Sequence, residues 1–378
     1  MTRLLLLALF FFPAGSYAGD EKTVVFSGVQ YPLEIAVSPG GPAGVPLYES
    51  AVSESVRTAY DTVIMQGEMP DPGVRPEIWV KSKSLFKAFD KYRPAGFKRF
   101  PNGRFWAKFD VAATRQPLKL VILDDGIAGA HLFKIYELEA VSGSSQKLED
   151  SAEEQGPSPA SAEDDAPFSI EEALPFTLVR REAWKAAPPK EPYARHAPKA
   201  FTLHHTAGYL PKTYAESVAE IQFVQDYHQN AKGWNDIGYH FLIDPLGNIF
   251  EGRPLYAVGA HVLNRNTDNI GVSVMGNYHP PASNKPAAET LGSFGKVGTY
   301  LSGNYSIAVS SFHAHREIGS TDCPGDLLYA KMPALKELIY ARPVPAAAGP
   351  VAPEAAAAPA AAPSLRQLRE CAIPGQFR

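Results

Sequence analysis

The chain has 378 residues, of which 45% are hydrophobic and 20% are charged. That length exceeds one modest domain and that composition excludes general disorder, so we expect two globular units. The 36 basic and 40 acidic residues give a net charge of −4, which disfavours binding to nucleic acid or to an acidic membrane. The two cysteines are too few for a disulfide framework.

The first 18 residues have the pattern of a secretory signal peptide. The basic residue Arg3 precedes the apolar run Leu4 to Phe12, and Ser16-Tyr17-Ala18 forms a small-x-small cleavage site. The apolar run is far shorter than the roughly 20 residues of a membrane-spanning helix, and no later segment supplies such a run. We therefore expect a secreted or periplasmic protein without a membrane span.

Residues 19–140 are expected to form a small, mainly-β domain of unknown role. Short β-rich runs at Ile78–Val80 and Leu118–Leu123 accompany turn signals such as Pro101-Asn102-Gly103. Basic and aromatic residues interleave from Lys81 to Lys119. Short elements with a buried aromatic face and a solvated basic face explain this pattern better than a polymer-binding surface does.

Two segments of low complexity flank the second globular unit. Residues 141–170 are rich in Ser, Ala, Pro and acidic residues and cannot bury enough apolar surface to fold, which predicts a flexible linker. Residues 343–378 begin as a nearly continuous Ala/Pro tail. This leaves residues 171–342 as the second folded domain.

Residues 171–342 alternate strand and helix patterns, which predicts an α/β domain with a mixed central β-sheet flanked by helices. Thr213-Tyr214-Ala215-Glu216 has the form of a capping box at the start of a helix. Strands at Gly238–Ile243 and Asn248–Glu251 flank a turn at Asp244-Pro245-Leu246-Gly247. The other elements expected here are a strand at Ile270–Met275 and helices at Thr290–Leu301 and Gly325–Tyr340.

Histidines and a cysteine near predicted strands of this domain suggest a metal site. His204 and His205 are adjacent on a strand, so they point to opposite faces and only one can be a ligand. His313 and His315 share a face if their segment is extended, so strand geometry does not choose between them. Cys323 follows in a loop that can fold back toward the strand end. These residue types suit a catalytic zinc site, which has three protein ligands and an open position for water.

A disulfide between Cys323 and Cys371 is the alternative to a metal site. The separations between the histidines and Cys323 match no short zinc signature, so spacing alone leaves both interpretations open. An isolated histidine on a strand is also more often a packing or surface residue than a ligand.

A series of motifs runs in order from Leu178 to Tyr340. The motifs are LVRREAW at 178–184, LHHTAG at 203–208, GWNDIGYHFLIDPLGNIFEGRP at 233–254, VGAH at 258–261, NIGVSVMGN at 269–277, HRE at 315–317 and DCPGD at 322–326. Together they resemble the peptidoglycan recognition protein and phage-type N-acetylmuramoyl-L-alanine amidase family. The resemblance covers less than half of the chain and does not extend to the N-terminal unit.

The resemblance implies a zinc centre formed by specific residues. His204, the first histidine of the pair, would be a ligand together with His315 and Cys323. Tyr239 matches the catalytic tyrosine of the family and would donate a hydrogen bond to the oxyanion of the transition state. Thr321 matches a second catalytic position, which is often threonine in recognition-protein amidases and lysine in phage members.

Substrate-binding groups are expected near this centre. His261 matches the substrate-contacting histidine of the family, and Trp234 is a candidate for the border of the cleft. Arg253 and Arg265 are candidates for binding stem-peptide carboxylates, because guanidinium groups suit bidentate recognition of carboxylates.

The function implied by the resemblance is that of a secreted zinc-dependent N-acetylmuramoyl-L-alanine amidase. Such an enzyme hydrolyses the amide between N-acetylmuramic acid and L-alanine of peptidoglycan or muropeptides, using water activated by Zn²⁺. Family members that only bind the wall have commonly lost a ligand, typically the cysteine, whereas Cys323 is present here. The alternatives are a non-catalytic muropeptide-binding module and a scaffold with the Cys323–Cys371 disulfide. The sequence indicates neither the general base nor the oligomeric state.

Overall fold

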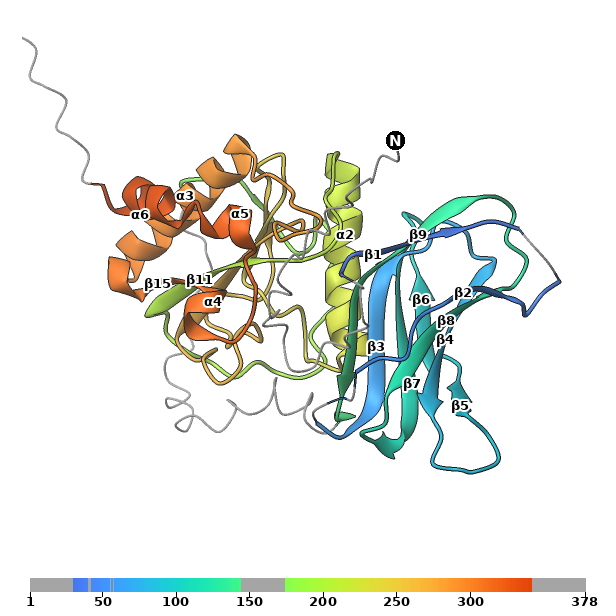
Figure 1. The fold of residues 1–378 in the computed structure, drawn as a ribbon. Coiled ribbons are helices and arrows are strands. Elements are labelled where there is room, and N and C mark those ends of the chain that lie inside the picture. The colour runs from blue at the N-terminus through green and yellow to red at the C-terminus, as the bar shows by residue number, and fades with distance from the viewer. Residues whose placement is uncertain (1–29, 40–41, 55, 57, 144–173, 342–378) are drawn as a thin grey trace, which may run out of the picture. The chain divides into compact units, whose positions relative to one another are not determined.

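The computed structural model describes residues 30–39, 42–54, 56, 58–143 and 174–341 (Figure 1). The described residues up to Tyr340 belong to one compact unit, and Ala341 belongs to a second unit. The predicted signal peptide, nearly all of the predicted linker and the predicted tail with Cys371 lie outside the described residues. Within the described ranges, no helix has the length and apolar character needed to cross a membrane.

The N-terminal β region, residues 30–143, contains two antiparallel sheets, as its β-rich runs predict. The two sheets share one hydrophobic core, which contains Phe105 and Phe109 from one sheet and Ile78 and Leu120 from the other. The five-stranded sheet has the order β1 (Leu33–Val37), β9 (His131–Val141), β3 (Tyr60–Glu68), β7 (Arg104–Thr114) and β6 (Gly96–Arg99). The four-stranded sheet has the order β2 (Pro46–Glu49), β8 (Leu118–Asp124), β4 (Val74–Lys81) and β5 (Phe89–Tyr92).

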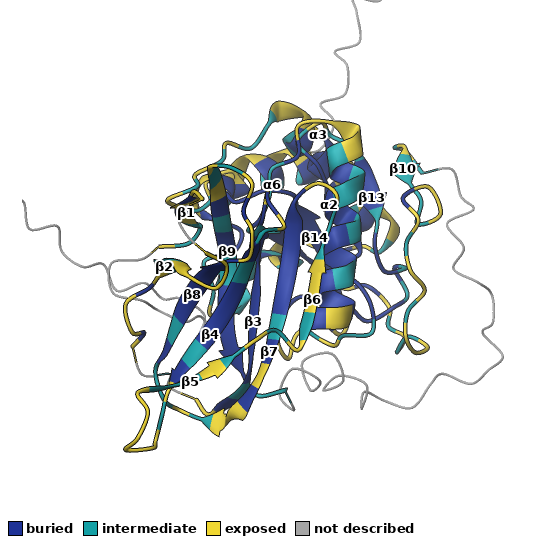
Figure 2. Ribbon diagram, turned by 90° about the vertical axis from the view of Figure 1, so that its right-hand side faces the viewer, coloured by how far each residue is buried: buried dark blue, intermediate teal, exposed yellow. Residues whose placement is uncertain are grey.

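The α/β region, residues 174–341, is built on a six-stranded mixed sheet, which confirms the predicted fold class. Neighbouring strands are parallel except for the β12–β13 hairpin. The central strand β14 is buried along its whole length (Figure 2). The sheet has the order β10 (Leu178–Val179), β13 (Ile249–Glu251), β12 (Phe241–Ile243), β14 (Asn269–Val274), β11 (Ala200–His205) and β15 (Phe312–Ala314).

Helices cover both faces of this sheet. Helices α3 and α6 share a core with residues of β11, β12 and β14 on one face. Helix α2 packs with Leu242 and Phe250 on the other face. The helices are α2 (Tyr214–Asp226), α3 (Ala288–Asn304), α4 (His315–Ile318), α5 (Asp326–Tyr329) and α6 (Met332–Tyr340), with a π-helical turn at Tyr227–Ala231 and a 3₁₀ turn at Val309–Ser311.

The start of α2 has hydrogen bonds of the predicted capping signal between Thr213 and Glu216. Thr213 has an extended backbone, and its Oγ1 accepts the backbone N–H of Glu216 at 3.2 Å. Backbone hydrogen bonds from Lys212, at 2.7 Å, and from Thr213 lower the pKa of the Glu216 carboxylate. The hydroxyl of Thr213 satisfies one of the free N–H groups at the helix start.

Helix α2 lies between the sheet of the α/β region and the N-terminal β region (Figure 1). Arg104 of β7 and Glu220 of α2 form an ion pair at 2.8 Å, and their side chains are only 2% and 0% exposed. Trp106 Nε1 donates to Asp226 Oδ1 at 2.7 Å. These polar contacts and a shared apolar cluster join the two regions, and no local pattern of the sequence predicts them.

Two predicted elements are shorter in the structure. The helix expected at Gly325–Tyr340 is divided into α5 and α6. Pro333 lies at the second residue of α6 and has no N–H, so it cannot bond the carbonyl of Tyr329 and continue α5 into α6. The strand expected from Gly238 begins only at Phe241, which leaves Tyr239 in the preceding loop. The turn at Asp244–Gly247 agrees with its prediction, since Gly247 has a φ of +84° and donates to Asp244 O at 3.1 Å.

Candidate metal centre and cleft

The mixed sheet brings three side chains together at the carboxyl ends of β11 and β15, namely those of His204, His315 and Cys323. One donor atom from each side chain lies within 4.8 Å of the other two. His204 Nδ1 is 3.6 Å from Cys323 Sγ, and the rings of His204 and His315 have centroids 4.5 Å apart. The cysteine is a free thiol in the structure. The group that the family resemblance implied is therefore brought together by the fold.

Strand pairing explains how distant histidines meet. Leu203 of β11 pairs with Ala314 of β15 in a parallel register, so His204 and His315 follow at the same sheet edge. Strand β15 ends at Ala314, whose N–H donates to Glu317 Oε2 at 2.9 Å, and His315 is the first residue of α4. The segment is thus not extended through His315.

Strand geometry alone also left His205 and His313 open as metal ligands. In the structure, neither ring joins the group of three donors. His313 stays on β15 opposite Thr202 and is not part of the group. The backbone N–H of His205 donates to Cys323 Sγ at 3.4 Å, while its Nδ1 accepts the N–H of Tyr278 at 3.3 Å. His205 therefore supports the cysteine through its backbone and does not offer its ring to the group.

The hydrogen bonds behind His204 assign its tautomer. His261 Nε2 lies 3.0 Å from the carbonyl oxygen of Asn269, so Nε2 carries the proton that it donates there. His261 Nδ1 is then an acceptor, and it lies 3.0 Å from His204 Nε2, which must be the donor. This arrangement leaves His204 Nδ1 with its lone pair directed toward the group, as metal-binding histidines require.

Burial sets the protonation of the three side chains. Burial lowers the pKa of His204 well below its ordinary value and lowers that of His315 to about 4, so both imidazoles are neutral near pH 7. Burial raises the pKa of the Cys323 thiol to about 12, and the N–H of His205 opposes this effect only in part. A bound cation would favour the thiolate. Two neutral imidazoles and one thiol form a donor set that fits zinc.

A cavity of about 700 Å³ opens beside this group. Tyr239 lines it and is partly buried, with its ring centroid 5.3 Å from that of His204; desolvation of the phenol raises its pKa, so the phenol keeps its proton. Thr321 also lines the cavity, but its Oγ1 accepts the N–H of Cys323 at 3.2 Å. This hydrogen bond gives Thr321 a role in holding the cysteine loop.

Two residues predicted to bind substrate, His261 and Trp234, line the cavity and also contact neighbouring histidines. His261 lines it and also accepts a hydrogen bond from His204, so it orients that residue in addition to lining the cavity. Trp234 lines it beside His228, with ring centroids 4.7 Å apart. The Trp234 Nε1 atom is buried and has no hydrogen-bond partner among the described residues.

The two arginines proposed from the sequence do not line this cavity, so the structure does not support carboxylate binding by them in the cleft. Arg253 is 4% exposed, and its Nε and Nη1 atoms donate to the carbonyl oxygens of Ile237 and Val258, each at 2.7 Å. Its guanidinium group therefore fixes loop backbone. Arg265 is exposed in the loop that precedes β14.

The cavity also contains charged residues that the sequence analysis did not identify. Glu137 and Glu139 of β9 line it together with Lys232, whose ammonium lies 3.5 Å and 3.0 Å from their carboxylates. The alternation Glu137-Leu138-Glu139-Ala140 in strand β9 places both carboxylates on one face. That pattern could have identified the pair, but not its partner in the other region.

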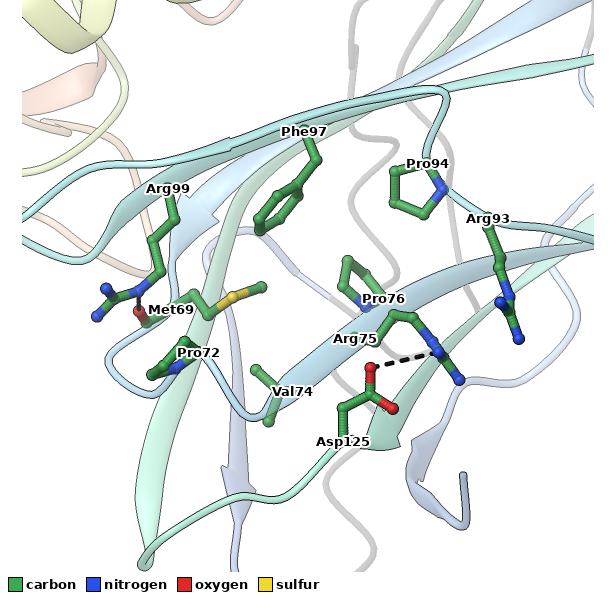
Figure 3. Close-up of a pocket in the computed structure, with 10 residues that line it drawn as sticks. All are labelled: Met69, Pro72, Val74, Arg75, Pro76, Arg93, Pro94, Phe97, Arg99 and Asp125. Carbon is green, nitrogen blue, oxygen red and sulfur yellow. Dashed lines mark hydrogen bonds and ion pairs between the residues drawn. The ribbon is translucent and has the colours of Figure 1, made fainter. Parts of the chain in front are cut away.

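A second cavity, of about 390 Å³, lies within the N-terminal β region (Figure 3). Phe97, several prolines and three arginines line it. The arginines are engaged by the protein, because Arg75 pairs with Asp125 at 3.3 Å, Arg93 pairs with Glu77 at 3.4 Å, and Arg99 Nε donates to Met69 O at 2.7 Å. None of the lining residues belongs to the metal-binding group.

Comparison with known proteins identifies similar chains. The family model described as N-acetylmuramoyl-L-alanine amidase matches residues 194–326. Peptidoglycan-recognition protein SC2 of Drosophila melanogaster is 34% identical over 160 residues, which cover 42% of this chain and 85% of that protein. N-acetylmuramoyl-L-alanine amidase of Homo sapiens is 35% identical over 156 residues, which cover 39% of this chain and 26% of that protein. The crystal structure of peptidoglycan recognition protein-LE in complex with tracheal cytotoxin is 29% identical, with a TM-score of 0.39, over 42% of this chain and 92% of that one.

Proposed function

Because the chain belongs to the N-acetylmuramoyl-L-alanine amidase and peptidoglycan recognition protein family, we propose that it is a secreted, zinc-dependent N-acetylmuramoyl-L-alanine amidase. Its substrates are peptidoglycan or muropeptides, in which it hydrolyses the amide between N-acetylmuramic acid and L-alanine. The observation that carries this proposal is the group of His204, His315 and Cys323, whose donor set is that of a catalytic zinc site.

The residues around this group have distinct tasks in the proposed reaction. When bound, zinc supplies Lewis-acid catalysis at neutral pH. His261 keeps the proton of His204 on Nε2, and Thr321 and His205 hold the loop and the sulfur of Cys323 through hydrogen bonds. The phenol of Tyr239 donates a hydrogen bond to the carbonyl oxygen of the scissile amide as that oxygen gains negative charge.

Replacing the phenol tests the task of Tyr239. We expect Tyr239→Phe to lower kcat by about 10² to 10³, because that is the cost of removing one oxyanion donor in other enzymes. Zinc content and thermal stability should stay close to those of the wild type. Tyr214→Phe, at a residue 46% exposed on α2, is the matched control. Full turnover by Tyr239→Phe with zinc bound would remove Tyr239 from the mechanism.

Product analysis tests the proposed function itself. Purified protein with zinc should release free stem peptide from a disaccharide muropeptide, as measured by mass spectrometry. His315→Ala should abolish release, whereas His313→Ala should retain it, because His313 lies outside the group. A zinc-loaded protein that binds muropeptide and releases no peptide would instead be a recognition module.

A further inference from the structure

The cavity beside the metal-binding group has walls from both regions of the chain. Tyr239, Trp234 and Cys323 line it from the α/β region. From the N-terminal β region it is lined by residues of β3, β7 and β9 and of the segments before β1, before β3 and after β9, including Tyr31, Thr58, Ala59, Glu137, Glu139 and Ser142. The N-terminal β region therefore forms part of the cavity beside the candidate reaction site.

Buried contacts fix this second wall against α2. Arg104 Nη1 donates to Gly67 O at 2.7 Å while the guanidinium also pairs with Glu220, so one side chain ties β3 and β7 to the helix. Near the cavity, Tyr227 donates its hydroxyl proton to Glu137 Oε2 at 2.8 Å. A wall held by buried charged groups is pre-organised for binding.

A continuous series of aromatic rings links this wall to the metal-binding group. The ring of His228 has centroid distances of 5.8 Å to Tyr239, 4.7 Å to Trp234 and 6.1 Å to Tyr227. Tyr227 contacts Glu137, while Tyr239 contacts His204. A ligand that occupies the cavity of about 700 Å³ therefore faces the reaction site and the wall together.

We propose that the N-terminal β region forms the second wall of the substrate site and contacts the part of a muropeptide that lies beyond the scissile amide. This inference rests on the proposed function, since it assigns the cavity to that substrate. The wall contains the Glu137 and Glu139 carboxylates, which pair with Lys232, and the polar side chain of Thr58. Such groups hydrogen-bond the amide N–H and sugar hydroxyl groups of a muropeptide.

Replacing each of two exposed alanines by tryptophan, one inside and one outside the cavity, tests the wall. Ala59 is exposed at the cavity, and Ala88 is exposed in the loop before β5, outside the cavity. Kd for a disaccharide muropeptide is measured by calorimetry in full-length Cys323→Ser protein, in which the proposed function predicts no hydrolysis of the ligand. We expect Ala59→Trp to weaken binding at least about tenfold and Ala88→Trp to leave Kd unchanged. Equal Kd values for the two variants would overturn the inference.

A polar variant and the active protein complete the test. Glu137→Gln keeps the shape of the wall, and we expect it to raise KM in the zinc-loaded enzyme while kcat and zinc content stay the same. A wild-type KM would contradict contact with substrate, and so would a fall in kcat alone. Because binding is measured without hydrolysis, an inactive but binding protein would reject the proposed function and still decide the inference.

Discussion

At the scale of single residues, the tautomer of His204 depends on the hydrogen bond that it donates to His261. That bond directs His204 Nδ1 toward Cys323, and His261 is itself fixed by the carbonyl of Asn269. Outer partners of this kind commonly account for 10- to 100-fold in metal affinity. His261 therefore acts on the metal centre through His204, in addition to lining the cavity.

We expect His261→Ala to lower zinc affinity by about 10- to 100-fold, because His204 then loses the acceptor that sets its tautomer. Competition with a chromophoric chelator measures this affinity. His313→Ala is the control, since it removes a histidine outside the group. Equal zinc affinities for His261→Ala and the wild type would show that the hydrogen bond does not orient His204.

The motifs of the chain point to His204, His315 and Cys323, which the fold brings together, whereas no motif shows which side chains are held by backbone groups. Strand alternation alone left His204 and His205 as alternatives, and only the family resemblance selected His204. Nothing in the sequence shows that the guanidinium group of Arg253 is consumed by the carbonyl oxygens of Ile237 and Val258. An arginine in a predicted cleft loop was therefore assigned to ligand binding.

At the scale of elements, α2 connects the N-terminal β region to the mixed sheet. The capping residue of α2 was predictable from Thr213 and Glu216. The packing of the N-terminal β region against this helix was not. A glutamate on a helix is usually solvated, whereas Glu220 is fully buried against Arg104. The two residues are separated by 116 positions, a separation that local patterns do not reach.

We expect Arg104→Met to lower the free energy of unfolding by about 3 to 5 kcal/mol, because it leaves the Glu220 carboxylate buried without its cation. The double variant Arg104→Met/Glu220→Leu should recover much of that loss, since no unpaired charge remains. Urea denaturation at pH 7 measures both. Lys119→Met, which breaks the partly exposed pair with Glu49, is the control and should cost at most about 1 kcal/mol. A loss for Arg104→Met no greater than the control would contradict a structural role for the pair.

At the scale of the whole molecule, the α/β region keeps several imidazoles neutral by burial. Burial lowers the pKa of His205, His228 and His261 to about 3 and that of His315 to about 4. In the unfolded chain these groups protonate near pH 6.5. As the pH falls below that value, the unfolded state binds protons that the folded state excludes, so stability is lost toward pH 4.

Zinc-free protein should therefore be less stable at pH 5 than at pH 7.5, with a loss of about 2 kcal/mol for each imidazole that stays neutral in the fold. His228 is the most informative position, because it lies outside the metal-binding group and accepts the N–H of Gly238 at 3.0 Å. We expect His228→Gln to lose correspondingly less stability over this range in urea denaturation. An identical loss in variant and wild type would show that His228 is protonated in the folded state.

The fold class was predictable because alternating strand and helix patterns are local. The joint cavity was not, because it depends on how the N-terminal β region packs on α2, and no short-range pattern encodes that packing. Glu137 and Glu139 line the cavity because of the same contact between the two regions. Sequence reasoning therefore assigned the site to one region, whereas the structure builds the cavity from two.

Zinc X-ray absorption spectroscopy of the purified protein tests whether His204, His315 and Cys323 bind one catalytic zinc ion. We predict about one zinc per chain, with one sulfur at about 2.3 Å and two imidazole nitrogens at about 2.0 to 2.1 Å, and loss of the sulfur contribution in Cys323→Ser. Protein without zinc, or zinc surrounded only by nitrogen and oxygen, would contradict the account.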